Sequence, residues 1–270
     1  MIKVPFYWLD IFTNQQFKGN PAAVCLMKTD YPDKVYQSIA SELKLSETAF
    51  AEKIKNNEYK LRWFTPSMEA PLCGHATMAT AHTLFTKHGL ESPVLFHTMS
   101  GVMKVEKEGD DVALNFPFFS FEETDDLRIL EPLGIRDYIE VRYSNLGAYT
   151  VVLRDRDQVS KINPDFRKLR ELCSKMKILG VAVTARGSGS TDFVYRVFAP
   201  GAGIDEDQGT GIAQCIFSKY WSKKLGKTKM HSVQLSERGS EMSVEVTENG
   251  VRITGKVTEL IEGQLVLQFD

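Results

Sequence analysis

The stretch Leu72-Cys73-Gly74-His75-Ala76-Thr77 decides how this chain of 270 residues is organised. An apolar run ends at Gly74, and a helix-like segment from Met78 to Phe85 follows it. A glycine turn that opens a helix leaves backbone N–H groups without an internal partner, and the peptide dipoles add partial positive charge there. Such a turn can hold a carboxylate or phosphate without a cationic side chain. We therefore predict an anion site at this turn.

A second turn of the same kind occurs later in the chain. Asp207-Gln208-Gly209-Thr210-Gly211 precedes the apolar run from Ile212 to Phe217. An Arg-x-Phe-x-Pro strand end leads into each turn, as Arg62-Trp63-Phe64-Thr65-Pro66 in the first case and Arg196-Val197-Phe198-Ala199-Pro200 in the second. We interpret this as an internal duplication.

Composition limits the classes of protein that fit. A hydrophobic content of 43% with 25% charged residues describes a soluble globular protein, and a net charge of -2 provides no basic excess for nucleic acid. The N-terminus reaches Asp10 too early for a signal peptide, and no run approaches membrane-spanning length. We expect a cytoplasmic protein that binds neither nucleic acid nor membrane.

The four cysteines form neither a zinc motif nor a disulfide framework, because they are widely spaced and include no C-x-x-C pair. We interpret Cys25, Cys173 and Cys215 as small core residues. Only Cys73, beside the first glycine turn, raises a chemical question. His75 and His82 could share one side of a helix, but no third ligand follows from the spacing, so we predict no metal.

The order of expected elements is the same in the two halves. In the first half the order is a strand at 22–27, a helix at 30–43, a strand-like stretch at 45–51 and a strand at 59–64. In the second half the strand at 149–153, the helix at 164–176 and the run 178–183 follow in turn. Strands dominate without a regular βαβ alternation, which favours an α+β fold with mixed or antiparallel sheets.

The acidic run 122–126 is typical of a linker. We predict a first repeat domain over residues 1–122, completed by the C-terminal strand 258–270, and a second repeat domain over 127–257. Two related halves with a glycine turn each suggest a cleft between domains that holds a small acidic molecule. Either glycine alone would be more simply explained as a tight turn.

Glu47 is the best candidate for proton transfer, since a carboxylate among apolar strand neighbours would be partly desolvated and its pKa raised. The Ser-Glu-Thr run could instead be an exposed strand edge or a helix start. His75 could donate to a substrate or pass on a proton, although an ordinary capping role explains it equally well. Asp207 follows two other acids, which are usually a solvated loop, and only its position singles it out.

Four motifs together resemble the phenazine-biosynthesis PhzF-like isomerases over nearly the whole chain. They are Gly19-Asn20-Pro21-Ala22-Ala23-Val24, Leu45-Ser46-Glu47-Thr48-Ala49-Phe50, Arg62-Trp63-Phe64-Thr65-Pro66 and Cys73-Gly74-His75-Ala76-Thr77. The resemblance implies the diaminopimelate epimerase fold, with two pseudo-symmetric domains that each curl a sheet round a central helix. It also implies an enzyme without a cofactor, a small carboxylate substrate and a homodimer.

The resemblance assigns roles to residues of both turns. Glu47 would move the proton, and His75 and Asp207 would contact the substrate and assist. We also expect substrate contacts from the remaining motif positions, which are Asn20, Gly74, Gly209, Thr210, Gly211 and Ile212. The second motif departs from the family pattern Glu-Asp-Pro-Val-Thr-Gly-Ser-Ala-His, because Ile212 replaces the serine and Gln214 the histidine.

Three functions follow from these observations. The first is an isomerase that moves a proton within a small, cyclic or unsaturated carboxylate by general acid–base catalysis, as in a biosynthetic pathway. The second is a non-catalytic descendant that binds a metabolite or a protein. The third is an epimerase or racemase, for which the second turn lacks a partner for Cys73.

Overall fold

The computed structural model describes residues 1–268 and divides them into two compact units. Unit 1 contains residues 1–115 together with the chain from Ile253 onward, and unit 2 contains residues 116–252. The chain passes from one unit to the other within two strands, β8 (Asp111–Pro117) and β17 (Gly250–Gly255). The last two residues of the predicted C-terminal strand, 269–270, lie outside the described residues.

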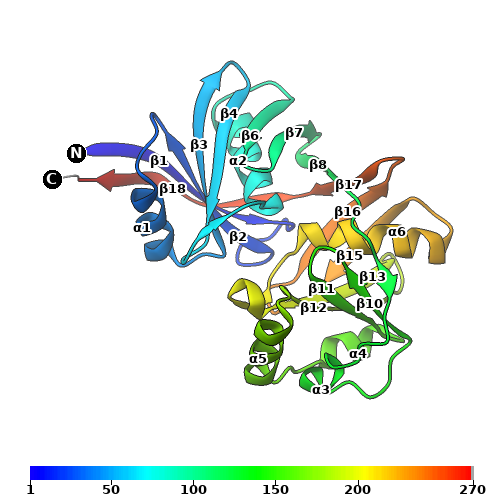
Figure 1. The fold of residues 1–270 in the computed structure, drawn as a ribbon. Coiled ribbons are helices and arrows are strands. Elements are labelled where there is room, and N and C mark those ends of the chain that lie inside the picture. The colour runs from blue at the N-terminus through cyan, green and yellow to red at the C-terminus, as the bar shows by residue number, and fades with distance from the viewer. Residues whose placement is uncertain (269–270) are drawn as a thin grey trace. The chain divides into compact units, whose positions relative to one another are not determined.

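Unit 1 is a mixed sheet with two helices (Figure 1). Its remaining elements are β1 (Ile2–Ile11), β2 (Asn20–Met27), α1 (Asp33–Leu43), β3 (Glu47–Lys55), β4 (Glu58–Phe64), β5 (Glu69–Ala70), α2 (Gly74–Lys87), β6 (Val94–Thr98), β7 (Gly101–Glu108) and β18 (Val257–Leu267). β2 pairs with β1 antiparallel and with β3 parallel, and β4 pairs with β3 and β5 antiparallel and with β6 parallel. β18 pairs with β1, so the C-terminal strand belongs to the sheet of the first repeat.

Unit 2 repeats this order and adds short helices. Its elements are β9 (Glu122–Glu123), α3 (Leu130–Leu133), β10 (Glu140–Ser144), β11 (Ala148–Val152), α4 (Arg156–Lys161), α5 (Phe166–Met176), β12 (Gly180–Arg186), β13 (Phe193–Ala199), η1 (Pro200–Ala202), β14 (Ile204–Asp207), η2 (Gly211–Ala213), α6 (Gln214–Leu225), β15 (Lys229–Gln234) and β16 (Ser240–Val246). The pairing pattern is that of unit 1, with β11–β12 parallel, β12–β13 antiparallel and β13–β15 parallel. The predicted duplication is therefore present in the strand pairing itself.

Helix α2 is the centre of unit 1, where it packs against β1, β2, β3 and β7. It is buried on nearly every side although its sequence contains several threonines. The hydroxyls of Thr77, Thr80 and Thr83 donate to the carbonyl one turn earlier, at 2.5 Å, 2.8 Å and 3.0 Å. Because a buried hydroxyl costs free energy unless it is hydrogen-bonded, these contacts explain how a threonine-rich helix occupies the core.

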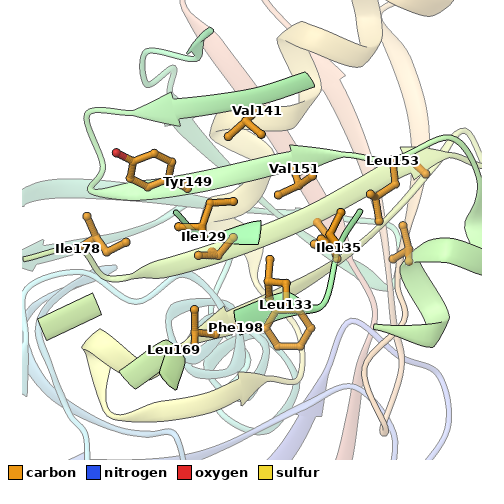
Figure 2. Packing of buried hydrophobic residues seen from close by; sticks show 14 of the residues in the cluster. Ile129, Leu133, Ile135, Val141, Tyr149, Val151, Leu153, Leu169, Ile178 and Phe198 are labelled. Carbon is orange, nitrogen blue, oxygen red and sulfur yellow. The ribbon is translucent and has the colours of Figure 1, made fainter. Parts of the chain in front are cut away.

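The core of unit 2 is an apolar cluster between its sheet and the helices α3, α4 and α5. Figure 2 shows Val151, Leu169 and Phe198 among its members. Helix α5 buries Leu169 and Cys173, which lie one turn apart, and begins where the Asp165 side chain accepts from the Lys168 N–H. The predicted helix at 164–176 thus has a side-chain cap and an apolar face.

The crossings between the units lie within β8 and β17 and not at the acidic run proposed as a linker. Glu123 of that run is in β9 and pairs with Arg142, and Asp126 accepts from Arg128 and from the Tyr149 hydroxyl. These acids are therefore part of unit 2, which explains why a run of charges did not mark the boundary. The Arg128 guanidinium holds the pKa of Asp126 below its usual range.

The mixed sheets with few helices confirm the α+β class. Among residues 1–268, no helix is both long enough and apolar enough to cross a membrane.

Candidate functional site

Glu47 begins β3, opposite Ala22 in the parallel pairing with β2. Its side chain is only 15% exposed. The start of β2, which follows Gly19, brings the buried Asn20 to the same place. A Cβ on Gly19 would lie 2.2 Å from the Ile11 carbonyl oxygen, and φ is +65° there, so only glycine fits this turn.

His75 lies beside Glu47, with its Nε2 atom 3.3 Å from Glu47 Oε2. Its Nδ1 atom lies 3.4 Å from Asn20 Nδ2. An amide nitrogen can only donate, so in this arrangement Nδ1 accepts and the ring proton of neutral His75 is on Nε2. That proton points to the Glu47 carboxylate and to the Ser46 hydroxyl, which lies 3.4 Å from Nε2. The imidazole therefore connects the buried Asn20 to the candidate base.

Cys73 completes the cluster and precedes α2 in extended conformation. Its sulfur lies 3.5 Å from His75 Nδ1. The side chain of Cys73, the N-cap residue, makes no capping hydrogen bond to α2, whose first residue is Gly74. The first N–H groups of a helix need acceptors from outside it, so this terminus suits an anionic group of a ligand.

The spacing of residues in the sequence predicted no metal site, but the structure brings three potential metal ligands together. One ligand atom each from Glu47, Cys73 and His75 lie within 4.8 Å of one another. Oxygen, sulfur and nitrogen donors of this kind are used by zinc. His82, the other histidine considered from the sequence, is not in this group and lies 3.6 Å from Glu259.

The second repeat has no counterpart of the Glu47 carboxylate. Gly180 pairs with Ala148 as Glu47 pairs with Ala22, so the glycine stands at the place of the glutamate. A Cβ on Gly180 would lie 2.1 Å from the Phe198 carbonyl oxygen. No residue larger than glycine fits this position without a backbone shift.

Thr210 stands at the place of Cys73. Each residue is extended and directly precedes the glycine that opens a helical segment. The contacts around the two turns are also equivalent. Ser100 Oγ donates to the carbonyl two residues before Cys73, that of Pro71, at 2.6 Å, and Ser236 Oγ donates to the carbonyl two residues before Thr210, that of Gln208, at 2.7 Å. A threonine hydroxyl thus replaces the thiol in the second repeat.

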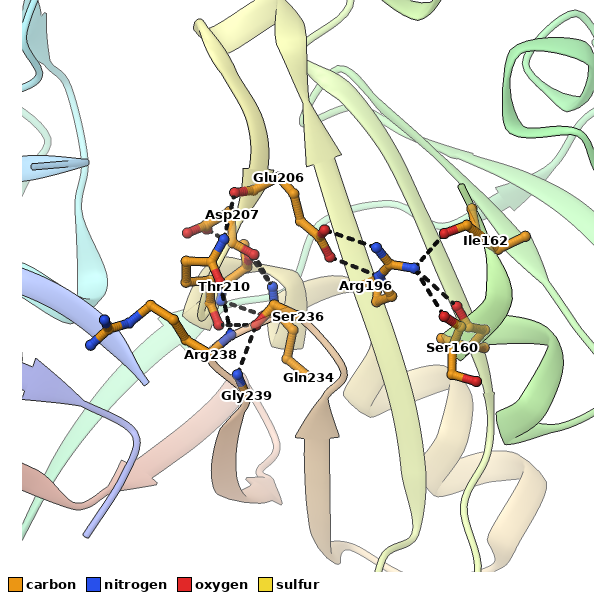
Figure 3. Close-up of polar contacts among 12 residues, drawn as sticks. Ser160, Ile162, Arg196, Glu206, Asp207, Thr210, Gln234, Ser236, Arg238 and Gly239 are labelled. Carbon is orange, nitrogen blue, oxygen red and sulfur yellow. Dashed lines mark hydrogen bonds and ion pairs between the residues drawn. The ribbon is translucent and has the colours of Figure 1, made fainter. Parts of the chain in front are cut away.

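Asp207 is held in a polar network within unit 2 (Figure 3). The Thr210 hydroxyl donates to Asp207 Oδ2 at 2.6 Å, and the Gly209 N–H lies 3.5 Å from Oδ1. Gln234, which is fully buried, accepts from the Thr210 N–H at 2.6 Å and donates to the Asp207 carbonyl at 2.5 Å. The Gln234 amide therefore joins both ends of the turn, and the Thr210 N–H is already used by the protein.

The Arg-x-Phe-x-Pro repeat has a structural role in both halves. Arg62 binds both oxygens of Glu69 at 2.7 Å, and Arg196 binds those of Glu206 at 2.7 and 2.8 Å. Each guanidinium also lies over the ring of the phenylalanine two residues later. These bidentate contacts join the strand before each glycine turn to the short strand that enters it.

The helix that follows the second glycine turn begins later than the sequence predicts. Gly211–Ala213 forms the 3₁₀ turn η2, and α6 begins only at Gln214. The Gln214 side chain is fully buried, where it contacts the Met242 sulfur and the Ser218 hydroxyl. Ile212 is half-buried, whereas Gly209 and Gly211 are buried. Gln214 is therefore a core residue of unit 2.

Three cysteines are core residues, as predicted. Burial raises the pKa of the Cys215 thiol to about 12 and also raises the pKa values of the Cys25 and Cys173 thiols. Unreactive thiols of this kind act as small apolar side chains.

Sequence reasoning missed several members of these networks. Ser46 lay inside a quoted motif without a role, and Gln234 and Ser236 had no signal because they are distant in sequence from the turn they contact. Glu69 and Glu206 did have a signal, since each lies five residues before the glycine, Gly74 or Gly211, that opens the helical segment of its turn. A search for an acid common to both copies would have found them.

Comparison with known proteins identifies the relatives of the chain. The family model described as phenazine biosynthesis-like protein, PhzC-PhzF, matches residues 9–263. An uncharacterized isomerase of Pseudomonas aeruginosa is 40% identical, with 98% of this chain and all of the relative covered. An uncharacterized isomerase of Halalkalibacterium halodurans is 35% identical over 99% of this chain and its own full length.

Solved structures show the same fold. A PhzF family protein of Enterococcus faecalis superposes with a TM-score of 0.92 at 39% identity, covering 98% of this chain and all of that chain. A hydroxyproline epimerase of Agrobacterium vitis shares the fold alone, with a TM-score of 0.67 at 12% identity, over 97% of this chain and 92% of its own. The predicted epimerase-like α+β fold is therefore confirmed.

Proposed function

Because this chain belongs to the PhzF family of phenazine biosynthesis-like proteins, we propose that it is an isomerase that moves a proton within a small unsaturated or cyclic carboxylate. Glu47 is the base in this proposal, and the contact of its carboxylate with His75 Nε2 at 3.3 Å is the observation that carries it. The family and its epimerase-like fold support an isomerase or epimerase role; the choice of substrate and mechanism is our inference.

The proposed reaction has two proton transfers on one face of the substrate. The ionised Glu47 takes a proton from a carbon next to a carbon–carbon double bond, and the electron pair spreads into the conjugated carboxylate. Protonated Glu47 then returns the proton to the far carbon, which shifts the double bond and restores the carboxylate. His75 donates to Glu47 Oε2 when that carboxylate is ionised, so it favours the form that takes the proton.

The negative charge of the substrate has a natural partner in the start of α2. The N–H groups of its first turn, beginning at Gly74, would bind the carboxylate and stabilise the charge that develops on it. We assign a further substrate contact to Asn20 on the family resemblance. No metal or cofactor is part of this mechanism.

Two observations favour a proton shift over epimerisation. Inversion of a stereocentre usually requires a base on each face of the carbon, and Gly180 and Thr210 stand where the second repeat would need a carboxylate or a thiol. A threonine hydroxyl does not ionise near neutral pH. An epimerase therefore remains the less supported alternative.

A non-catalytic binding protein is the other alternative. Such a protein has no need for a carboxylate that touches an imidazole inside a buried cluster, which costs desolvation energy. Thermal shift with a panel of cyclic and aliphatic carboxylic acids identifies ligands, because binding to the native state raises Tm. Hits are then incubated with the enzyme and followed by NMR. Binding of several hits without conversion of any would favour the binding protein.

A further inference from the structure

A cavity of about 420 Å³ lies in unit 1, away from the Glu47 cluster. β5 pairs with β4 only at Trp63 and Phe64, and β6 pairs with β4 from Glu58 to Lys60. Leu61 and Arg62 lie between these pairings, and both line the cavity. We name it the β4 notch, which is lined by Lys60, Leu61, Arg62, Trp63, Glu69, Ala70, His97, Thr98 and Met99.

The second repeat covers the same place with its own chain. Arg196 is the counterpart of Arg62, and its third guanidinium nitrogen donates to main-chain carbonyls at the end of α4, including Ile162 at 2.6 Å. α4 also buries Val159 in a cluster against which Val233 and Leu235 pack. Unit 1 has only a short connection between β2 and α1, so nothing corresponds to α4 and the notch stays open.

The residues that line the β4 notch therefore differ from those at the equivalent place in unit 2. By strand register, Lys60 corresponds to the buried Val194 and His97 to Val233. Lys60, Arg62 and His97 thus bring three basic side chains to one cavity, where Glu69 is the one acid. Leu61, Ala70 and the 65% exposed Met99 provide its apolar surface.

Of the acids that pair with these bases, Glu69 lies in the lining and is only 25% exposed, and Glu58 contacts His97 Nε2 at 2.8 Å, whereas the other two lie outside the lining and are exposed. Arg62 Nη1 contacts Asp33 at 2.8 Å, and Lys60 contacts Asp30 at 2.7 Å. The Asp33 and Asp30 side chains are 77% and 51% exposed, and exposed ion pairs contribute little. A ligand acceptor can therefore replace Asp33 on Arg62, just as carbonyls occupy the equivalent nitrogen of Arg196.

We propose that the β4 notch is a second ligand site that binds a small aliphatic carboxylate. The carboxylate takes the place of Asp33 on Arg62 and contacts Lys60, and the carbon chain lies on Leu61, Ala70 and Met99. The cavity has the size of small-molecule sites in proteins. The proposal is independent of the proposed isomerase function, because the two sites share no residue.

The test is an NMR titration of the full chain with 4-methylpentanoate, using the indole N–H of Trp63 as the reporter. That group is buried and has no hydrogen-bond partner among residues 1–268, and its signal is assigned by its loss in Trp63→Phe. We expect saturable shifts with the acid and none with 4-methylpentanamide. The amide has the same shape without the charge, so equal shifts with both would contradict the proposal.

Four variants test where the carboxylate binds. Asp33→Asn removes the competing acid and should tighten binding by about two- to fivefold. Lys60→Met should weaken it by a similar factor. Asp205→Asn removes the exposed partner of Arg170 in unit 2 and should leave binding unchanged. An affinity unchanged in Asp33→Asn and in Lys60→Met would place the ligand elsewhere and overturn the proposal. So would a loss of binding in Glu47→Gln when the Trp63 signal of the free variant is at its wild-type position.

Discussion

Glu47 and Gly180 occupy the same register position in the two repeats, and the proposed one-base mechanism depends on the difference between them. Only the first repeat has room for a side chain there. The single carboxylate, its imidazole partner and the nearby thiol are therefore confined to unit 1.

Glu47→Gln should cut kcat by about 10²- to 10⁴-fold on any substrate found, because it keeps the shape and removes the titratable group. Cys73→Ser should have a much smaller effect, since the thiol is not the proposed base. Steady-state kinetics of both variants on the same substrate makes the comparison. If Cys73→Ser reduced kcat more than Glu47→Gln did, Cys73 and not Glu47 would be the base.

Gly180→Ala should destabilise the protein by about 1–3 kcal/mol, as is usual for overpacking. The added Cβ would meet the Phe198 carbonyl oxygen at 2.1 Å. Gly263→Ala is the matched control, because nothing lies within 4 Å of a Cβ at that position. The measurement is urea unfolding of each variant. Equal stability of Gly180→Ala and wild type would mean that the second repeat could have kept a side chain.

At the scale of elements, each glycine turn is held by an arginine on the strand before it. Arg196→Lys keeps the charge and loses the two-pronged contact with Glu206 and the contacts to the α4 carbonyls. We expect a loss of about 1.5–3 kcal/mol, the usual contribution of hydrogen bonds to charged groups. Arg170→Lys, at an exposed pair with Asp205, should change stability by less than about 0.5 kcal/mol. Equal losses in denaturant unfolding would contradict this account.

Helix α2 contains a pH-dependent contribution at His82. Burial lowers the pKa of His82, and the nearby Glu259 opposes this only in part, while Lys87 and Lys107 add to it. The folded state therefore favours neutral His82, so its contribution to stability is present above the ordinary histidine pKa of about 6.5 and is lost as the pH falls through it.

The corresponding measurement is unfolding free energy between pH 8 and pH 5. Wild type should lose stability over this range, and His82→Gln should lose less. A His82→Gln profile parallel to that of wild type would rule out this contribution.

At the scale of the whole molecule, the sequence predicted the α+β class, the family and the duplication, because the repeated motifs lie where strands enter the turns. It did not predict where the chain crosses between units. A boundary inside β8 and β17 leaves no compositional signal, whereas a charged run such as Glu122–Asp126 does, although it is bound within unit 2.

The candidate site was predictable only where its residues lie within motifs. Glu47, His75 and Gly74 each belong to one, and the structure brings the first two into contact. Gln234 could not be found, because its contact with Thr210 depends on the strand order of β13, β14 and β15. The β4 notch could not be found from the sequence either, because it is open only where unit 1 has no counterpart of α4.

The family resemblance also predicts a homodimer. Sedimentation equilibrium should give a mass of about twice the 30.5 kDa of one chain. A mass that stays at one chain up to high micromolar concentration would contradict this expectation.

The most direct test of the one-base proton shift is the reaction of a substrate, once identified by thermal shift, in D₂O with the wild-type enzyme. The account predicts a product with the double bond moved, in which the hydrogen taken by Glu47 appears at the new carbon, partly exchanged for deuterium and always on the same face. Glu47→Gln should give no product on the same time scale. Substrate recovered with deuterium at a single inverted carbon would instead require a base on each face and would contradict the central claim.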